Sequence, residues 1–281
     1  MSRLSRIEKA EAFQALHRAE GTFLMPNAWD AGSAILLEQA GFAAIGTTSA
    51  GIAFSRGLPD YTNRLSRDDN LAAIAQICEA VEVPVSADTE NGYGRRLQDV
   101  RDTMTMTLET GAVGASIEDY SGNRNIGLFD IEEAVDRVSA AIDAIDASGI
   151  PGVLTARAEC FLCGHEAPLS ESITRLNRYR QAGAHCLYAP GPKDAETIAT
   201  LVKEVDGPLN VVAGLSPEAL SVEELCNLGV RRISTGGSLA RACLAALRRS
   251  AAEIMESGTF SFAGQTIADA ELSALFAKVR E

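Results

Sequence analysis

The sequence has little positive charge. It contains 25 lysine and arginine residues against 38 aspartate and glutamate residues, which gives a formal net charge of -13. Nucleic-acid binding depends largely on cations that neutralise phosphates, so this deficit argues against a nucleic-acid partner. It also argues against binding to an anionic membrane surface. A small anionic substrate is compatible with the composition if local cations offset the general negative field.

The sequence also lacks long apolar runs and linker-like segments. No apolar stretch reaches the roughly 20 residues of a membrane-spanning helix. Residues 1–20 mix acidic and basic side chains without the apolar core of a secretory signal, so we expect a cytoplasmic protein. No stretch rich in proline, glycine or serine divides the chain, so we expect one domain over residues 1–281.

Six cysteines are scattered through the chain, several of them in apolar surroundings. We interpret them as reduced cysteines of a cytosolic protein. Cys160 and Cys163 have the spacing of a redox motif, which leaves a redox role as the alternative for that pair.

Short apolar runs alternate with helical patterns along the chain. The runs are residues 22–26, 43–48, 83–88, 114–118, 152–157, 185–189, 209–213 and 231–235. The helical patterns are residues 31–40, 68–81, 97–110, 131–147, 169–182, 195–204 and 221–228. Eight strands alternating with helices predict an α/β fold of the (β/α)₈ TIM-barrel type, and a doubly wound open sheet is the alternative.

Residues 239–281 follow the last predicted strand as a helical extension. Residues 239–256 and 268–280 have helical patterns, separated by a glycine-containing turn. Surplus helices on a closed barrel need a surface to pack against, and a neighbouring subunit would provide one. We therefore expect a homo-oligomer.

Acidic residues follow two neighbouring predicted strands. Asp88 and Glu90 follow the third strand, and Glu118 and Asp119 follow the fourth. A barrel gathers the carboxyl ends of its strands at one opening, and clustered carboxylates repel each other unless a proton or a cation joins them. Mg²⁺ needs only one or two carboxylates and keeps several waters, so Asp88 is the candidate nearest ligand. Pairing with arginines, or helix capping, is the alternative.

Arg157 ends the fifth predicted strand, where it would be partly buried and would need a partner. It could bind a substrate carboxylate through two parallel hydrogen bonds. It could equally form an ion pair with Glu159 or Glu118, and the sequence leaves both possibilities open.

Loops at the same opening supply further candidates. Ser49, Ala50 and Gly51 form a small-residue turn whose backbone N–H groups could bind an anion. Asp60 lies in a long second loop that is suited to act as a lid. His165 follows the fifth strand and is either an acid–base group or a solvated histidine.

Together these residues resemble the isocitrate lyase/phosphoenolpyruvate mutase superfamily over nearly the whole chain. The resemblance is specific because several motifs occur in order, although each alone is common. The motifs occupy residues 26–34, 49–51, 57–60, 88–94, 116–119, 155–157, 182–184 and 228–234.

The resemblance implies a Mg²⁺-dependent barrel, with Mn²⁺ as the alternative ion, that cleaves or rearranges C–C or C–P bonds of 2-oxo acids and related carboxylates. It also implies dimers or tetramers that exchange a C-terminal helix. The residues that match family positions are Asp88, Glu90 and Glu118 at the metal, Ser49, Ala50 and Gly51 at the substrate carboxylate, Arg157 near the oxo-acid end, and Asp60 in the mobile loop.

Departures from the family pattern narrow the subtype. Ile126 and Leu128 stand where isocitrate and methylisocitrate lyases carry a cysteine and a histidine, which argues against isocitrate cleavage. Tyr120 takes the place of the mutase lysine, and Asn125 partly stands in for a later mutase asparagine. The chain therefore looks like the branch that contains oxaloacetate decarboxylase-like and other 2-oxo acid lyases.

We expect a lyase or decarboxylase that acts on a small 2-oxo acid through an enolate. Glu118 and Arg157 are the candidate catalytic residues at the charged centre, and Tyr120, His165 or a metal-bound water is the candidate proton donor. A C–P bond mutase or hydrolase and a non-catalytic oxo-acid-binding protein are the alternatives.

Overall fold

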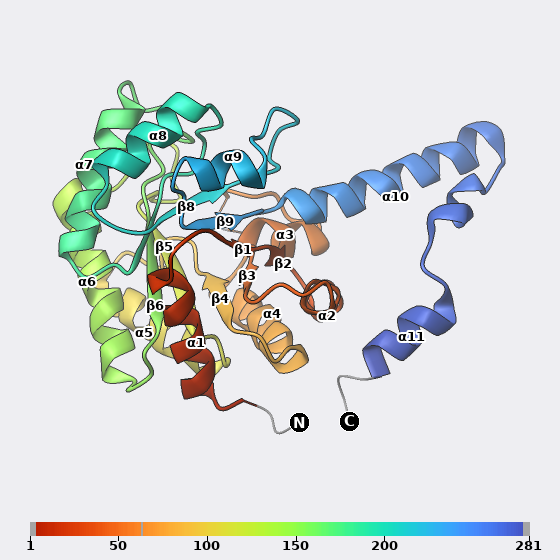
Figure 1. The fold of residues 1–281 in the computed structure, drawn as a ribbon, viewed down its shortest axis with the longest axis horizontal. Helices are drawn as coiled ribbons and strands as arrows, with labels where there is room; N and C mark the ends of the chain where they lie inside the picture. Colours follow the sequence, from red (N-terminus) through yellow and green to blue (C-terminus); the bar gives the residue numbers. More distant parts are fainter. Residues whose placement is uncertain (1–3, 63, 278–281) are drawn as a thin grey trace.

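A computed structural model describes residues 4–62 and 64–277 as a barrel of parallel strands surrounded by helices (Figure 1). All neighbouring strands pair in parallel, in the order β1-β9-β8-β7-β6-β5-β4-β3-β2. The strands are β1 (Phe23–Met25), β2 (Asn27–Ala28), β3 (Ile45–Thr47), β4 (Val85–Asp88), β5 (Gly114–Glu118), β6 (Val153–Arg157), β7 (Cys186–Tyr188), β8 (Leu209–Val212) and β9 (Arg232–Ser234). The predicted (β/α)₈ barrel is confirmed.

The barrel closes at Pro26, which lies between β1 and β2. β1 pairs with β9, and β2 pairs with β3, so the first predicted strand contributes one half to each neighbour. Asn27 joins the two sides, because its side-chain amide donates to the Thr47 carbonyl and its oxygen accepts from the Gly236 N–H. A Cβ at Gly46 would lie 2.7 Å from Asn27 Nδ2, so this junction requires glycine. Because the last strand pairs with the first, the open-sheet alternative is wrong.

Helices that connect the strands surround the barrel. They are α2 (Ala31–Gln39), α4 (Arg67–Ala80), α5 (Leu97–Glu109), α6 (Ile131–Ala147), α7 (Pro168–Gln181), α8 (Ala195–Glu204) and α9 (Val222–Asn227). Their apolar faces bury side chains such as Ile74, Met104 and Leu176 against the strands. This burial of apolar area is the main stabilising contribution to the barrel.

An N-terminal helix that the alternation did not predict closes one end of the barrel. α1 (Arg6–Arg18) begins at Ser5, whose side chain forms a capping box with Glu8. Phe13 is fully buried among Met25, Ala44, Val113 and Val153, and the last three of these lie just before or at the start of their strands. The amino-terminal end of the barrel is therefore covered, and the carboxyl-terminal end is the one that can receive a ligand.

The C-terminal part of the chain leaves the barrel as an arm. α10 (Ser238–Ser257) runs away from the barrel, and η1 (Ser261–Gln265) and α11 (Asp269–Ala277) turn back (Figure 1). Phe276 of α11 packs against α2, 3.6 Å from the position of a Cβ at Gly32. The last residues of the second predicted helix, 278–280, lie outside the described residues.

Within residues 4–62 and 64–277, no helix combines the length and apolar character needed to cross a bilayer. The longest helix, α10, instead exposes apolar side chains along its length, including Leu247 at 67% and Met255 at 85% exposure.

Candidate active site

A cavity of about 400 Å³ opens at the carboxyl ends of the strands. This is the end at which a barrel gathers its loops, and the volume suits a small organic ligand. The structure brings most of the predicted site residues into its wall. Those that line the cavity are Ser49, Ala50, Asp60, Asp88, Glu90, Glu118, Tyr120 and Arg157.

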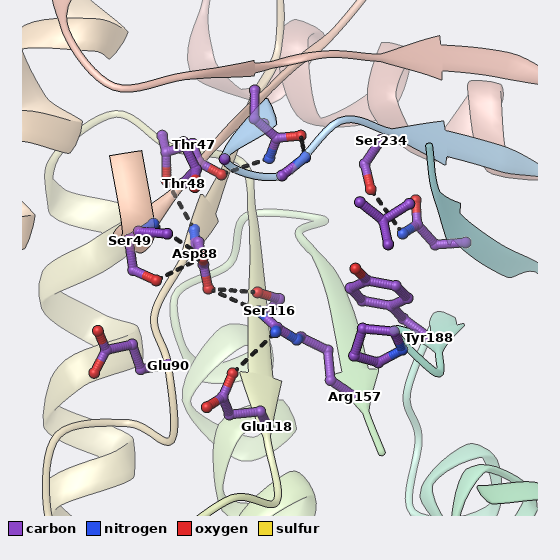
Figure 2. Close-up of a pocket in the computed structure, with 18 of the residues that line it drawn as sticks. Thr47, Thr48, Ser49, Asp88, Glu90, Ser116, Glu118, Arg157, Tyr188 and Ser234 are labelled. Carbon is purple, nitrogen blue, oxygen red and sulfur yellow. Dashed lines mark hydrogen bonds and ion pairs between the residues drawn. The ribbon is translucent and has the colours of Figure 1, made fainter. Parts of the chain in front are cut away.

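Asp88, the last residue of β4, lies at the centre of this group (Figure 2). One carboxylate oxygen accepts hydrogen bonds from the Ser49 backbone N–H at 3.0 Å and the Ser49 hydroxyl at 2.9 Å. The other accepts from Arg157 Nη1 at 3.1 Å. Parallel β-strand pairing therefore delivers Asp88 to a position where donors from two other strand ends meet.

The predicted turn at residues 49–51 is instead the start of a short helix, α3 (Ser49–Ser55). Thr48 caps this helix by accepting a hydrogen bond from the Gly51 N–H. A Cβ at Gly51 would lie 2.6 Å from Thr48 Cγ2, so glycine lets the cap form. Because Asp88 engages the Ser49 N–H, the Ala50 N–H is the amide of this trio that has no acceptor among the described residues.

Arg157 makes the ion pairs that the sequence left as an alternative. Its guanidinium lies 3.1 Å from Asp88, 3.1 Å from Glu118 and 2.8 Å from Glu159. It also lies over the Tyr188 ring, 5.2 Å from the centroid. Burial by itself would lower the pKa of Arg157, but the neighbouring carboxylates raise it well above its usual value. One permanent cation is thus shared by two buried carboxylates and one half-buried carboxylate.

The cavity contains more carboxylates than this cation can pair. No hydrogen-bond donor or cation contacts the Glu90 carboxyl among the described residues, and burial and the charges of Asp88 and Asp60 raise its pKa to about 8. Burial also raises the pKa of Glu118 and that of Asp60. Glu90 adopts a left-handed backbone conformation, with φ at 48°, that places it beside Asp88 after the strand ends.

The acids do not form a ready-made cage for a metal. Among residues 4–62 and 64–277, no three histidine, cysteine, aspartate or glutamate side chains come close enough together to hold an ion directly. Mg²⁺ usually keeps several waters and takes one or two carboxylates from the protein. The unpaired negative charge around Asp88 fits this mode, with Glu90 and Glu118 acting through water.

Three predicted residues lie outside the cavity wall: Gly51, Asn125 and His165. Asn125 lies in an exposed turn, where its backbone N–H donates to the Asn123 side chain. His165 accepts a hydrogen bond from the Ala167 N–H. The structure therefore does not bring Asn125 and His165 to the charged centre.

Asp119 is part of the scaffold behind the site. It accepts hydrogen bonds from the Tyr179 hydroxyl at 2.6 Å and from Arg175 at 3.2 Å, both on α7. It also accepts from the Glu159 backbone N–H at 2.8 Å. Asp119 thus anchors the segment that carries Arg157 and Glu159.

Several cavity residues were not predicted. Tyr188, Asn210 and Ser234 lie in or at the end of β7, β8 and β9, so the rule that selected Asp88 could have found them. Tyr61 comes from the second loop, where its hydroxyl donates to Glu159 at 3.4 Å and its ring contacts Tyr120 edge to face at 5.7 Å. No sequence signal distinguishes Tyr61 from other loop tyrosines.

Both the sequence and the fold of this chain match known proteins. Residues 13–255 match the family described as phosphoenolpyruvate phosphomutase. A candidate lyase/mutase from Burkholderia cenocepacia J2315 is 47% identical, with a TM-score of 0.93 and 97% coverage of each chain. A phosphonopyruvate hydrolase solved with oxalate and Mg²⁺ is 26% identical, with a TM-score of 0.86, covering 97% of this chain and 96% of that one.

A relative with another named activity is the oxaloacetate decarboxylase of Pseudomonas entomophila strain L48. It is 26% identical over 243 residues, which cover 84% of this chain and 81% of the relative. The family match covers most of the chain, including every strand of the barrel and all the residues that line the cavity. The chain therefore belongs to the phosphoenolpyruvate mutase family, within the isocitrate lyase/phosphoenolpyruvate mutase superfamily of lyase and mutase enzymes.

Proposed function

We propose that this protein is a Mg²⁺-dependent lyase or decarboxylase that acts on a small 2-oxo acid or a related dicarboxylate through an enolate. The observation that carries the proposal is the charged cavity wall: Arg157 pairs with Asp88 and Glu118 there and with Glu159 behind them, while no described residue pairs with Glu90. This arrangement suits a site completed by a divalent cation and an anionic substrate. The decarboxylase and the Mg²⁺-bound hydrolase among the similar proteins support both parts.

Asp88 would hold Mg²⁺, with Glu90 and Glu118 orienting its waters. When bound, the ion would supply Lewis-acid stabilisation of negative charge at the substrate oxygens. Arg157 would bind a substrate oxygen and add fixed positive potential where charge develops during bond cleavage. The Ala50 N–H, which has no acceptor among the described residues, would add a backbone donor from the first turn of α3.

Tyr120 is the better placed of the two side chains proposed as proton donor. It lines the cavity, whereas His165 does not. Burial raises the pKa of Tyr120, which keeps its hydroxyl protonated at neutral pH. The Tyr61 ring lies against Tyr120, and the two rings would limit access of water to an enolate.

A second candidate is a C–P bond mutase or hydrolase. Two comparisons favour it: the matched family is named for phosphoenolpyruvate phosphomutase, and a phosphonopyruvate hydrolase shares the fold at 26% identity. Such chemistry needs groups that stabilise a transferring phosphoryl group. Asn125, the residue that partly matches the mutase pattern, lies outside the cavity wall.

We also propose one cytoplasmic barrel domain that assembles as a homodimer or homotetramer. Residues 239–281 would form the helical extension that packs on the neighbouring subunit. Leu247, Met255 and Phe260 are 67%, 85% and 63% exposed on this arm, and burial between subunits would remove their apolar surface from water.

Turnover assays test the proposed reaction. Purified protein with Mg²⁺ is incubated with oxaloacetate, phosphonopyruvate and a set of 2-alkylmalates. Pyruvate and carbon dioxide from oxaloacetate, or cleavage of a 2-alkylmalate, support the lyase. Release of phosphate or formation of phosphoenolpyruvate supports the second candidate. Oxalate binding without any turnover indicates a non-catalytic oxo-acid-binding protein.

Asp88→Asn tests the metal. We expect it to lower kcat/KM by about 100-fold or more, because the nearest proposed ligand loses its charge. Asp68→Asn, at a side chain that is 83% exposed outside the site, is the matched control and is expected to leave activity unchanged. Full activity of Asp88→Asn in the presence of EDTA would contradict the metal-dependent reaction.

A further inference from the structure

Arg232, on β9, forms the floor of the cavity. It is 2% exposed. Its Nε donates to Asn210 Oδ1 on β8 at 2.8 Å, and its Nη2 donates to Thr155 Oγ1 on β6 at 2.9 Å. Since β6 and β9 are three positions apart in the sheet, the side chain crosses the barrel interior. Its guanidinium therefore lies between the cavity and the barrel end that α1 covers.

The guanidinium has no anionic partner in the part of the chain that the structure describes. Among the described residues, no ion pair joins Arg232 to a carboxylate, and its hydrogen-bond partners are Asn210, Thr155 and His17. His17 Nδ1 lies 2.8 Å from the Phe13 carbonyl, so we place the ring hydrogen on Nδ1. Nε2 is then free to accept from Arg232 Nη1 at 3.2 Å. All three partners are neutral, so a full positive charge is buried without compensation.

His17 remains neutral, and so remains a hydrogen-bond acceptor for Arg232, at neutral pH. Burial and the charge of Arg232 lower the pKa of His17 to about 3, so the ring stays an acceptor. An isolated charge in a protein interior is strongly destabilising. Removing the arginine would relieve this cost, so its presence calls for an anion that binds nearby.

Unused hydrogen-bond donors lie around the same charge. A guanidinium has five N–H groups, and three of those on Arg232 are accounted for. Asn210 Nδ2 donates to Ser234 Oγ at 3.0 Å, which leaves the Ser234 hydroxyl hydrogen without an acceptor among the described residues (Figure 2). Hydrogen bonds therefore run from Arg232 through Asn210 to Ser234, and the final donor lies in the cavity wall.

The floor of the cavity and the wall that carries Asp88 thus differ in charge. The wall with Asp88, Glu118 and Arg157 has more carboxylates than cations. The region around Arg232 and Ser234 has a cation and hydrogen-bond donors without acceptors. We propose that Arg232, acting with Ser234, is a specificity-determining residue that binds a second anionic group of the substrate. The cavity would then prefer a 2-oxo acid with an additional carboxylate or phosphonate over one with a neutral side chain. This inference rests on the proposed function for the oxo-acid end of the substrate.

Replacement of the charge tests the inference. In the presence of Mg²⁺, we expect Arg232→Met to raise KM for oxaloacetate and phosphonopyruvate by about tenfold or more, because a charge-assisted hydrogen bond is lost. Oxalate has no anionic group beyond the two carboxylates that would occupy the oxo-acid end, so its Kd should change by less than about twofold. Arg232→Lys keeps the charge and should restore part of the affinity. Comparing oxaloacetate with phosphonopyruvate shows whether the site distinguishes a carboxylate from a phosphonate. 2-Oxobutyrate, which has a neutral side chain, gives the affinity without a second anionic group.

Arg231→Met is the matched control, because Arg231 lies outside the cavity wall and donates to the Gly21 carbonyl at the surface. Thermal melting of each variant shows that it is folded, and Arg232→Met should fold because methionine fills a similar volume without a charge. Equal loss of oxalate and diacid binding in Arg232→Met, or no loss of either, would overturn the inference.

A magnesium-free measurement separates this inference from the proposed reaction. In EDTA, malonate and inorganic phosphate are titrated by calorimetry. Wild type and Arg231→Met should bind these dianions alike, and Arg232→Met should bind them at least about tenfold more weakly. Absence of binding to wild type, or binding that Arg232→Met leaves unchanged, overturns the role of Arg232. Wild type that binds malonate through Arg232 but fails to bind oxalate with Mg²⁺ overturns the proposed function alone.

Discussion

Glu90 shows how one residue can occupy an environment that disfavours its charged form for the sake of a site. Its carboxyl lies beside Asp88, and no described residue donates to it. Its neighbour Asp88, in contrast, has four donors around its two oxygens. A cation next to Glu90 would favour the charged form that burial now disfavours. The residue therefore links metal binding to the stability of the protein.

Glu90 predicts a fall in stability with rising pH in metal-free protein. Its folded pKa, raised to about 8, lies above the unfolded value near 4.5, so the folded state holds the proton more tightly. The free energy of unfolding then falls as pH rises from about 4.5 to 8, by roughly 1–4 kcal/mol. Glu90→Gln should flatten this part of the profile, measured by urea unfolding in EDTA, and Mg²⁺ should flatten it in wild type. The exposed Glu166→Gln serves as control, and an unchanged slope in Glu90→Gln would refute the assignment.

Among the elements, α1 has a role that its sequence alone does not reveal. It buries Phe13 and Ala10 in the end of the barrel and places His17 against Arg232. The helix thus covers the amino-terminal end of the barrel and contacts Arg232 at the floor of the cavity. One face of this charged helix becomes part of the core because it shields apolar side chains at the end of the barrel from water.

The His17 contact predicts acid sensitivity, opposite in sign to the effect of Glu90. Burial lowers the folded pKa of His17 to about 3, below the unfolded value near 6.5. The unfolded state therefore takes up a proton first, and stability is lost as pH falls from about 6.5 to 3, by roughly 1–4 kcal/mol. His17→Gln should reduce this loss in thermal unfolding profiles. The loop substitution His165→Gln should leave the loss unchanged, and a His17→Gln profile identical to wild type would refute the prediction.

For the whole molecule, the arm formed by α10, η1 and α11 is a part whose apolar side chains are poorly covered by the rest of the chain. It leaves the barrel and exposes apolar side chains, while α11 returns to contact α2 (Figure 1). Such a surface is typical of a protein–protein contact. The same arm begins beside the cavity, because Arg241 of α10 lines it. Assembly and the shape of the cavity entrance are therefore expected to depend on each other.

The double substitution Leu247→Glu with Met255→Glu tests the predicted assembly. We expect wild type to sediment as a dimer or tetramer and the variant to sediment as a smaller species, because two charges replace apolar contacts. Val222→Glu, at a 49% exposed position on α9, is the control for an added surface charge. Far-UV circular dichroism should show an intact fold in each case. A monomeric wild type, or a variant with unchanged sedimentation, would contradict the prediction.

Local signals account for the parts of the site that were predicted. Asp88, Glu118 and Arg157 end apolar runs, and parallel pairing brings such ends together whatever the details of the loops. Residues 49–51 look like a turn in the sequence because the helix that they begin has only seven residues, too few for a helical pattern to show. Asn125 is a candidate through a partial motif match and His165 through its place after a strand, and neither signal determines where a loop side chain lies.

The sequence by itself determined the barrel, its family and the clustering of acids at one opening. These features follow from strand periodicity and motif order, which can be recognised among residues close together in the chain. Only the tertiary structure decided that Arg157 pairs with three acids, that no described residue pairs with Glu90, and that Arg232 crosses the barrel to form a floor supported by His17. These contacts join residues as far as 215 positions apart, so they depend on barrel closure. No local pattern of residues encodes them.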